Sequence, residues 1–118
     1  EHTRTDTIMR TLAQTAKQYN VAIHVVAHPR KSGSSSKSAE EGGYISLDDI
    51  KGSSSMKQVP DIIITMQRDI TAEALEDRNT VVFSVLKNRY LGIVGVKQPV
   101  LFNVNTLRYS EPPQIEEF

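Results

Sequence analysis

Two cations that could bind a phosphate follow directly after an apolar, strand-like run of the sequence. Lys87 and Arg89 come after residues 80–86 (TVVFSVL), with one residue between them. Alternate side chains of an extended chain project to the same side, so both cations can contact one nucleotide phosphate. Charged residues without a ligand are the commoner occupants of a strand end, and that alternative stays open. The spacing indicates an anion site without establishing one.

A glycine- and serine-rich stretch forms a second candidate anion site. Residues 51–58 (KGSSSMKQ) place a glycine and three serines ahead of a predicted short helix, with Lys57 and Gln58 on its next turn. Free backbone N–H groups and hydroxyls at a helix N-terminus favour an anion. A capped surface helix that binds nothing explains the same residues equally well.

His28 is a third candidate, and it directly follows the apolar run of residues 21–27 (VAIHVVA). In open α/β sheets ligands bind just beyond the carboxyl ends of the strands, so a polar side chain there faces the usual site. A histidine bonded to a nearby carbonyl is the simpler interpretation, and we expect His24 in the core. The three histidines have neither metal-site spacing nor supporting carboxylates, so the sequence predicts no metal site.

The long basic loop after His28 does not have the pattern of a phosphate-binding P-loop. That motif requires a glycine directly before its lysine, between a strand and a helix, whereas Ser36 precedes Lys37 here. We expect a mobile loop that can at most contact a phosphate backbone. The sequence also shows no Ser/His/Asp set, cysteine nucleophile or close carboxylate pair, so hydrolase chemistry from this chain alone is unsupported.

Helices and strands alternate in the segments that position these residues. Residues 5–19 carry apolar side chains at helical spacing and predict an amphipathic helix. The run 21–27 is typical of a strand buried on both faces of a parallel sheet. A helical turn is expected at 46–51, a short helix at 53–59, a hairpin-like connection at 69–79, and strands at 61–67, 80–86, 99–104 and 106–109. This order indicates an α/β fold whose earlier strands are missing.

Composition excludes several classes of protein. The chain has 118 residues, 14 basic and 14 acidic side chains, no cysteine and 38% hydrophobic residues. This length makes one domain at most, and the zero net charge argues against a polycation that binds nucleic acid by bulk charge. Without cysteine there is no disulfide framework and no thiolate zinc site. Apolar runs far shorter than about 20 residues predict no membrane span, so we expect a soluble, intracellular, globular piece.

Taken together, these segments resemble the C-terminal half of the RecA-like motor domain of ring-shaped replicative DNA helicases of the DnaB-like superfamily. They are similar above all to phage primase-helicases and the mitochondrial helicase Twinkle. The likeness covers nearly all of residues 1–118 in one order and rests on VVAHPRK at 25–31, KGSSSMKQVPDIIITMQR at 51–68, and KNRYLGIVG with LFNVNTLRY at 87–109. It implies a partial RecA-like P-loop NTPase core, with a central, mostly parallel sheet, flanking helices and a C-terminal antiparallel hairpin.

The resemblance implies a role for each residue near the nucleotide phosphates. His28 would sense the γ-phosphate and relay its state to the adjacent DNA-binding loop, and Gln58 would lie near that phosphate. Arg89 would be the arginine finger supplied in trans to the neighbouring subunit's nucleotide, with Lys87 beside it. Such a finger contributes on the order of 10³-fold or more to the rate.

The resemblance also implies contacts to the nucleotide base and to DNA. Arg68 and Phe102 match positions that sandwich the base, although a phenylalanine lacks the hydroxyl that this position can carry. The residues expected to face single-stranded DNA and to track its phosphates without reading sequence are Arg30, Lys31, Lys37, Lys51, Ser53 and Lys57.

The family's P-loop, catalytic glutamate and magnesium-organising aspartate would precede this segment, and none of them is present in it. The resemblance therefore implies that ATP or another NTP binds with Mg²⁺ in an intact homohexameric parent, a 5′-to-3′ helicase. The chain alone would neither hold the nucleotide firmly nor hydrolyse it. The parent would act in the cytoplasm of a bacterial or phage-infected cell, or in the mitochondrial matrix for a Twinkle relative. A RecA-type recombinase and a non-catalytic module that binds single-stranded DNA or a helicase remain alternatives.

Overall fold

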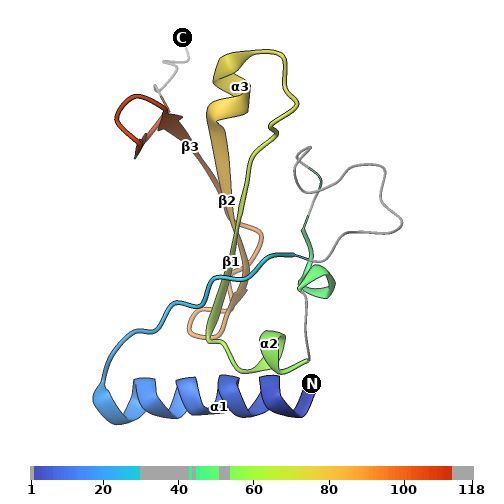
Figure 1. The fold of residues 1–118 in the computed structure, drawn as a ribbon, viewed down its shortest axis with the longest axis vertical. Coiled ribbons are helices and arrows are strands. Elements are labelled where there is room, and N and C mark those ends of the chain that lie inside the picture. The colour runs from blue at the N-terminus through green and yellow to red at the C-terminus, as the bar shows by residue number, and fades with distance from the viewer. Residues whose placement is uncertain (1, 30–42, 44, 51–53, 113–118) are drawn as a thin grey trace.

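The computed structural model describes residues 2–29, 43, 45–50 and 54–112 (Figure 1). Its helical elements are α1 (His2–Tyr19), the 3₁₀ turn η1 (Leu47–Asp49), α2 (Ser55–Gln58) and α3 (Leu75–Asn79). Its strands are β1 (Ile62–Gln67), β2 (Thr80–Asn88), β3 (Lys97–Asn103) and β4 (Arg108–Ser110). The predicted first helix, the helical turn before residue 51, the short second helix and the four strands after it are thus confirmed as local elements.

The four strands form one sheet in the order β1-β2-β3-β4, and every neighbouring pair is antiparallel. The expected RecA-like core with a central, mostly parallel sheet is therefore wrong for the described part of the chain. The reason lies in the connections: the segment between β1 and β2 returns the chain along the strand it has just left. Parallel neighbours would need a long crossover to the same end of the sheet instead.

The run 21–27 is not a strand, which is the second correction to the predicted fold. Asn20 has a positive φ of 50° and ends α1, and the following residues cross toward η1 without a ladder partner among the described residues. Val25 is 52% exposed and Val26 is 92% exposed. A continuous β-branched run predicts burial in a sheet only where neighbouring strands exist to pair with it, and pairing is not a local property of the run. Just beyond this run, Pro29 forms an isolated bridge with Ile50.

The two faces of the sheet differ in polarity because side chains alternate along each strand. Thr65, Gln67 and Ser84 share one face, where Thr65 and Ser84 are buried. The Gln67 side chain donates a hydrogen bond to the Gly43 carbonyl, which brings Gly43 against this face. Val81, only 3% exposed, lies on the opposite, apolar face.

Strand β1 forms one edge of this sheet. Its outward-facing residues remain in contact with solvent: Ile62 is 48% exposed, Ile64 is 56% exposed and Met66 is 52% exposed. An edge strand of this kind presents unpaired backbone N–H and C=O groups beside apolar side chains.

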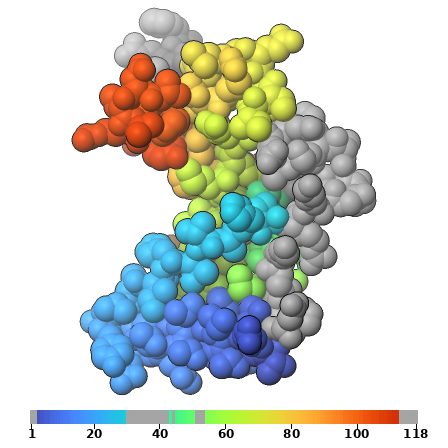
Figure 2. Space-filling view, viewed as in Figure 1, coloured from blue at the N-terminus to red at the C-terminus, as the bar shows by residue number. Residues whose placement is uncertain are grey.

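The molecule is elongated, with the helices α1 and α2 at one end and the strands β3 and β4 with α3 at the other (Figures 1 and 2). The chain's radius of gyration is 16.7 Å, against about 13.5 Å for a compact domain of this length. The buried apolar side chains in the described part are Met9, Ile45 and Val81. Among the described helices, none combines the length and the hydropathy needed to cross a bilayer.

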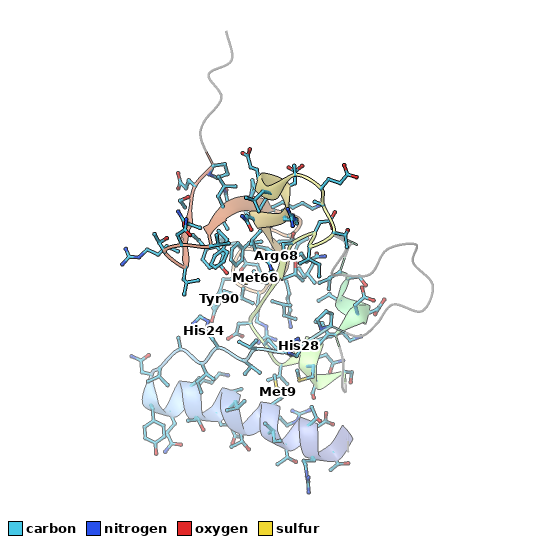
Figure 3. The ribbon with its side chains drawn as sticks, turned by 45° about the horizontal axis from the view of Figure 1, so that its top comes forward. Met9, His24, His28, Met66, Arg68 and Tyr90 are labelled. Carbon is cyan, nitrogen blue, oxygen red and sulfur yellow. The ribbon has the colours of Figure 1, made fainter. Side chains whose placement is uncertain are left out.

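Helix α1 is attached to the rest of the molecule through α2. Its apolar residues recur at helical spacing, and Met9, 6% exposed, lies on the side of the helix that faces α2 (Figure 3). The neighbouring Ile8 is 51% exposed because it lies on another face of the same turn. Met9 is therefore the buried apolar side chain of α1 in the described part of the chain.

We predict that Met9→Ala lowers the free energy of unfolding by about 2–3 kcal/mol, because it removes a buried side chain and leaves a cavity between α1 and α2. Urea denaturation followed by circular dichroism measures this loss. Ile8→Ala is the matched control, since half of that side chain is already in water, and it should change the free energy by less than about 1 kcal/mol. Equal effects of the two substitutions would contradict the packing described here.

Candidate anion-binding site

The site begins at the end of α2, where the helix leaves backbone carbonyls without intrahelical partners. Helix α2 ends at Gln58: Val59 still has helical dihedral angles, but Pro60 has no backbone N–H with which to continue the helical hydrogen bonds. The carbonyl oxygens of Lys57 and Gln58 both accept hydrogen bonds from the Lys87 ammonium, each at 2.9 Å. The Gln58 carbonyl also accepts a bond from Arg89 Nη2 at 2.8 Å. Two cations from the end of β2 therefore close the C-terminus of α2.

Asp61 holds the other side of the Arg89 guanidinium. Arg89 Nη1 donates to Asp61 Oδ1 at 2.7 Å, and the Arg89 backbone N–H donates to the Asp61 carbonyl at 2.9 Å. The Tyr90 hydroxyl donates to the second carboxylate oxygen, Oδ2, at 3.2 Å. We call Asp61, Lys87, Arg89 and Tyr90, with the Gln58 carbonyl, the cation cluster.

The cation cluster carries net positive charge and is open to solvent. Lys87 and Arg89 face one carboxylate, and the side chains of Arg89 and Asp61 are 51% and 47% exposed. An ion pair this exposed is screened by water and contributes at most about 1 kcal/mol to stability. The arrangement leaves two neighbouring cations accessible to an anion from solution.

The pKa of the Lys87 ammonium is lowered from its ordinary value of 10.5. Partial burial is the largest cause, and repulsion by the Arg89 guanidinium is the second; the Asp61 carboxylate opposes both. The environment of Lys87 therefore destabilises its protonated, positively charged form. An anion bound between Lys87 and Arg89 would relieve that destabilisation, so the electrostatics of the cluster favour one.

Three of the four residues expected to act at the nucleotide phosphates come together in this cluster: Lys87, Arg89 and Gln58. Gln58 contributes its backbone carbonyl to the contacts described above. His28 lies next to the Pro29–Ile50 bridge beside η1, and its side chain is exposed (Figure 3). In the described part of the chain, no hydrogen bond or ion pair joins His28 to Lys87 or Arg89.

The two residues expected to sandwich a base lie apart in this structure. Arg68 follows β1 and borders an open hollow of about 410 Å³ on the polar face, together with Gln67, Asp69, Asp77, Thr80, Val82, Ser84 and Lys97. Phe102 lies on the apolar face, where its ring packs against Tyr109 with centroids 5.1 Å apart. Figure 3 places Arg68 beside Met66, well away from α1. The base-sandwiching role of this pair stays a prediction.

Of the residues expected to contact DNA, Arg30, Lys31, Lys37, Lys51 and Ser53 lie outside the described residues. Lys57 is described, and its side chain is 34% exposed and forms an ion pair with Asp48 at 3.4 Å. Lys57 is also adjacent to the cation cluster, because its carbonyl accepts the Lys87 hydrogen bond.

Reasoning from the sequence missed two members of the cluster, Asp61 and Tyr90. Asp61 directly precedes β1, and Tyr90 directly follows Arg89. The sequence feature that could have revealed both residues is the predicted hairpin-like connection at 69–79. If the two strands that it joins are antiparallel, the residue before the first strand lies opposite the residues that follow the second. The observed register does this, with Ile62 opposite Asn88 and Asp61 next along the ladder opposite Arg89.

Comparison with known proteins relates the chain to a replicative helicase. No protein-family model matches the sequence. The chain is similar to the DNA helicase/primase of Enterobacteria phage T3, with 31% identity over 101 residues. The matched region covers 86% of this chain and 17% of the phage protein, so the chain spans about a sixth of the length of that relative. The similarity is distant, and it agrees with the resemblance to phage primase-helicases at the level of the protein class.

We predict that Arg89→Gln raises the pKa of Lys87 and that Asp61→Asn lowers it further, because the first removes a repelling cation and the second an attracting carboxylate. Heteronuclear NMR titration of the Lys87 side chain measures both changes. Burial is the largest cause of the shift, so Arg89→Gln should restore the pKa only in part. The pKa of Lys87 in the folded chain lies below 10.5, its value in the unfolded chain. Between these two values the unfolded chain binds more protons than the folded chain, so the free energy of unfolding should rise with pH there.

Glu73→Gln is the matched control, since Glu73 is exposed in the connection between β1 and β2, at the far end of that hairpin. It should leave the Lys87 titration unchanged. A Lys87 pKa that responds equally to all three substitutions would show that the cluster does not control it.

Proposed function

We propose that the chain is part of an NTP-driven, 5′-to-3′ replicative DNA helicase, in which Lys87 and Arg89 contact the phosphates of a nucleotide held by the neighbouring subunit of a hexameric ring. The observation that carries this proposal is the cation cluster: two adjacent, accessible cations with defined partners at the end of one hairpin. The similarity to a phage helicase/primase supports the assignment to this class of motor.

Arg89 is well suited to a phosphate because its partners leave part of the guanidinium available. Of the five N–H donors of the side chain, one is directed to Asp61 and one to Gln58, so with respect to the described residues three remain for a ligand. A planar guanidinium binds phosphate oxygens through two parallel hydrogen bonds, and charge that develops on the γ-phosphate strengthens both. Lys87 adds a second, more localised charge beside it.

The triphosphate itself and its Mg²⁺ would be held by residues outside this chain. Within the described residues no group of three or more histidine, aspartate or glutamate side chains is placed to hold a metal ion. The cations of the cluster fit the phosphate end of a nucleotide, which is the part of the reaction that we assign to this chain. When bound, Mg²⁺ would neutralise charge on the phosphates that Lys87 and Arg89 approach.

The hydrogen bonds of the cation cluster would couple nucleotide binding to the residues that contact DNA. Lys87 and Arg89 bind the carbonyls at the end of α2, and α2 carries Lys57, the described residue among those expected to contact single-stranded DNA. A phosphate bound by the remaining N–H groups of the two cations would draw positive charge toward itself and weaken their bonds to these carbonyls. Nucleotide turnover would thereby loosen and restore the attachment of α2 and shift Lys57 along the DNA backbone.

We predict that Arg89→Ala, made in the full helicase subunit, lowers NTP hydrolysis by about 10³-fold or more, because transition-state charge on the phosphates loses its stabilising cation. Phosphate release measures the rate, and gel filtration and a fluorescent nucleotide report ring assembly and binding, which should persist. Arg78→Ala, on the exposed surface of α3, should hydrolyse normally. Normal turnover by the Arg89 variant would remove the assignment of this residue.

A separate prediction concerns DNA. Lys57→Ala should weaken binding of single-stranded DNA and reduce the slope of log K against log salt by about 0.7, the value for one phosphate contact. Fluorescence anisotropy of a labelled oligonucleotide over a range of salt concentrations measures the slope. Lys17→Ala, in the last turn of α1, is the control for the loss of one positive charge. The proposed DNA contact would be wrong if both variants kept the slope of the unmodified protein.

A further inference from the structure

Asp61 and Arg89 form a cross-strand pair at the end of the β1–β2 ladder. Ile62 is paired with Asn88, and one step further the Arg89 N–H donates to the Asp61 carbonyl at 2.9 Å. The side chains of directly opposed residues lie close to one another, so the ladder itself brings the carboxylate to the guanidinium. The 2.7 Å contact between Asp61 Oδ1 and Arg89 Nη1 is therefore fixed by the backbone as well as by charge.

Hydrogen bonds constrain the guanidinium from two directions. Nη1 is bound by Asp61 and Nη2 by the Gln58 carbonyl at 2.8 Å, which together fix the plane and the tilt of the group. The carboxylate is constrained in turn, because the Tyr90 hydroxyl donates to its other oxygen at 3.2 Å. A surface ion pair usually has one such contact and leaves both side chains free to rotate.

We propose that Asp61 is a positioning residue for Arg89: it orients the guanidinium so that its remaining N–H groups face the phosphate. This inference rests on the proposed function, since it supposes that Arg89 contacts a nucleotide. Asp61 has two opposing effects on an anion. Its negative charge weakens attraction of a phosphate to the cluster, while its hydrogen bonds hold Arg89 in the geometry that hydrolysis requires.

These opposing effects separate a positioning role from a merely structural one. Without the charge of Asp61, an anion should bind as tightly as before or more tightly. Without its orientation, Arg89 should stabilise the transition state less well, and misplacement of a catalytic group by about 1 Å can cost on the order of 10²-fold in rate. A residue that only stabilises the fold would weaken binding and turnover together.

The first experiment uses this chain alone and does not depend on the proposed function. NMR of the Arg89 side chain reports how fast the guanidinium rotates, and the rotation should be slow in the unmodified chain. Asp61→Asn should make it fast, and Tyr90→Phe should give an intermediate rate because the carboxylate loses one anchor. Glu73→Gln removes the same charge at a distance and should change nothing. Rotation that is equally fast in all four chains would overturn the proposal.

The second experiment measures NTP hydrolysis by the full helicase subunit carrying the same substitutions. Asp61→Asn should lower kcat by about 10- to 100-fold with KM unchanged or lower, and Asp61→Glu should recover part of the loss. If Arg89→Ala abolishes hydrolysis while Asp61→Asn has the kcat of the Glu73→Gln control, the positioning role is wrong and the proposed function stands. If Arg89→Ala hydrolyses normally, the proposed function is wrong, and this inference fails with it whatever the guanidinium does.

Discussion

The hydrogen bonds from Lys87 and Arg89 to the last carbonyls of α2 hold the two ends of this molecule together. Helix α1 packs on α2, and α2 reaches the sheet through the cations at the end of β2. The contact satisfies carbonyls that a helix cannot satisfy itself, and it places positive charge where a helix C-terminus favours it. The residues that we assign to a phosphate are thus also residues on which the arrangement of helix and sheet depends.

The sequence predicted the local elements well and their arrangement poorly. The helix at 5–19 and the strands at 61–67 and 80–86 follow from apolar periodicity, which is a property of each segment alone. The run 21–27 has the composition of a buried strand, yet its neighbours decide whether it becomes one, and the described chain supplies none. The relative direction of β1 and β2 depends on the connection at 69–79: a hairpin-like connection joins antiparallel strands, whereas the resemblance implies a mostly parallel sheet.

In the candidate site, too, features of one segment could be predicted and contacts between distant segments could not. The spacing of Lys87 and Arg89 was enough to single them out, because two cations one residue apart after a strand must share a side. Asp61 is 28 positions away from Arg89 along the chain, and only the antiparallel register brings the two together. Gln58 was expected to lie near a phosphate, and its backbone carbonyl makes the contacts in the cluster. A backbone acceptor leaves no signature in the residue type.

The open edge of β1 has a consequence for handling the protein in solution. Ile62, Ile64 and Met66 expose apolar surface beside backbone groups that no described strand pairs with, which is a template for adding a strand from another copy. The chain also has a formal net charge of zero and an isoelectric point of about 7.1, so colloidal repulsion between copies is weakest near neutral pH. Solubility should pass through a minimum there, and buffers one or two pH units away would keep concentrated samples from precipitating.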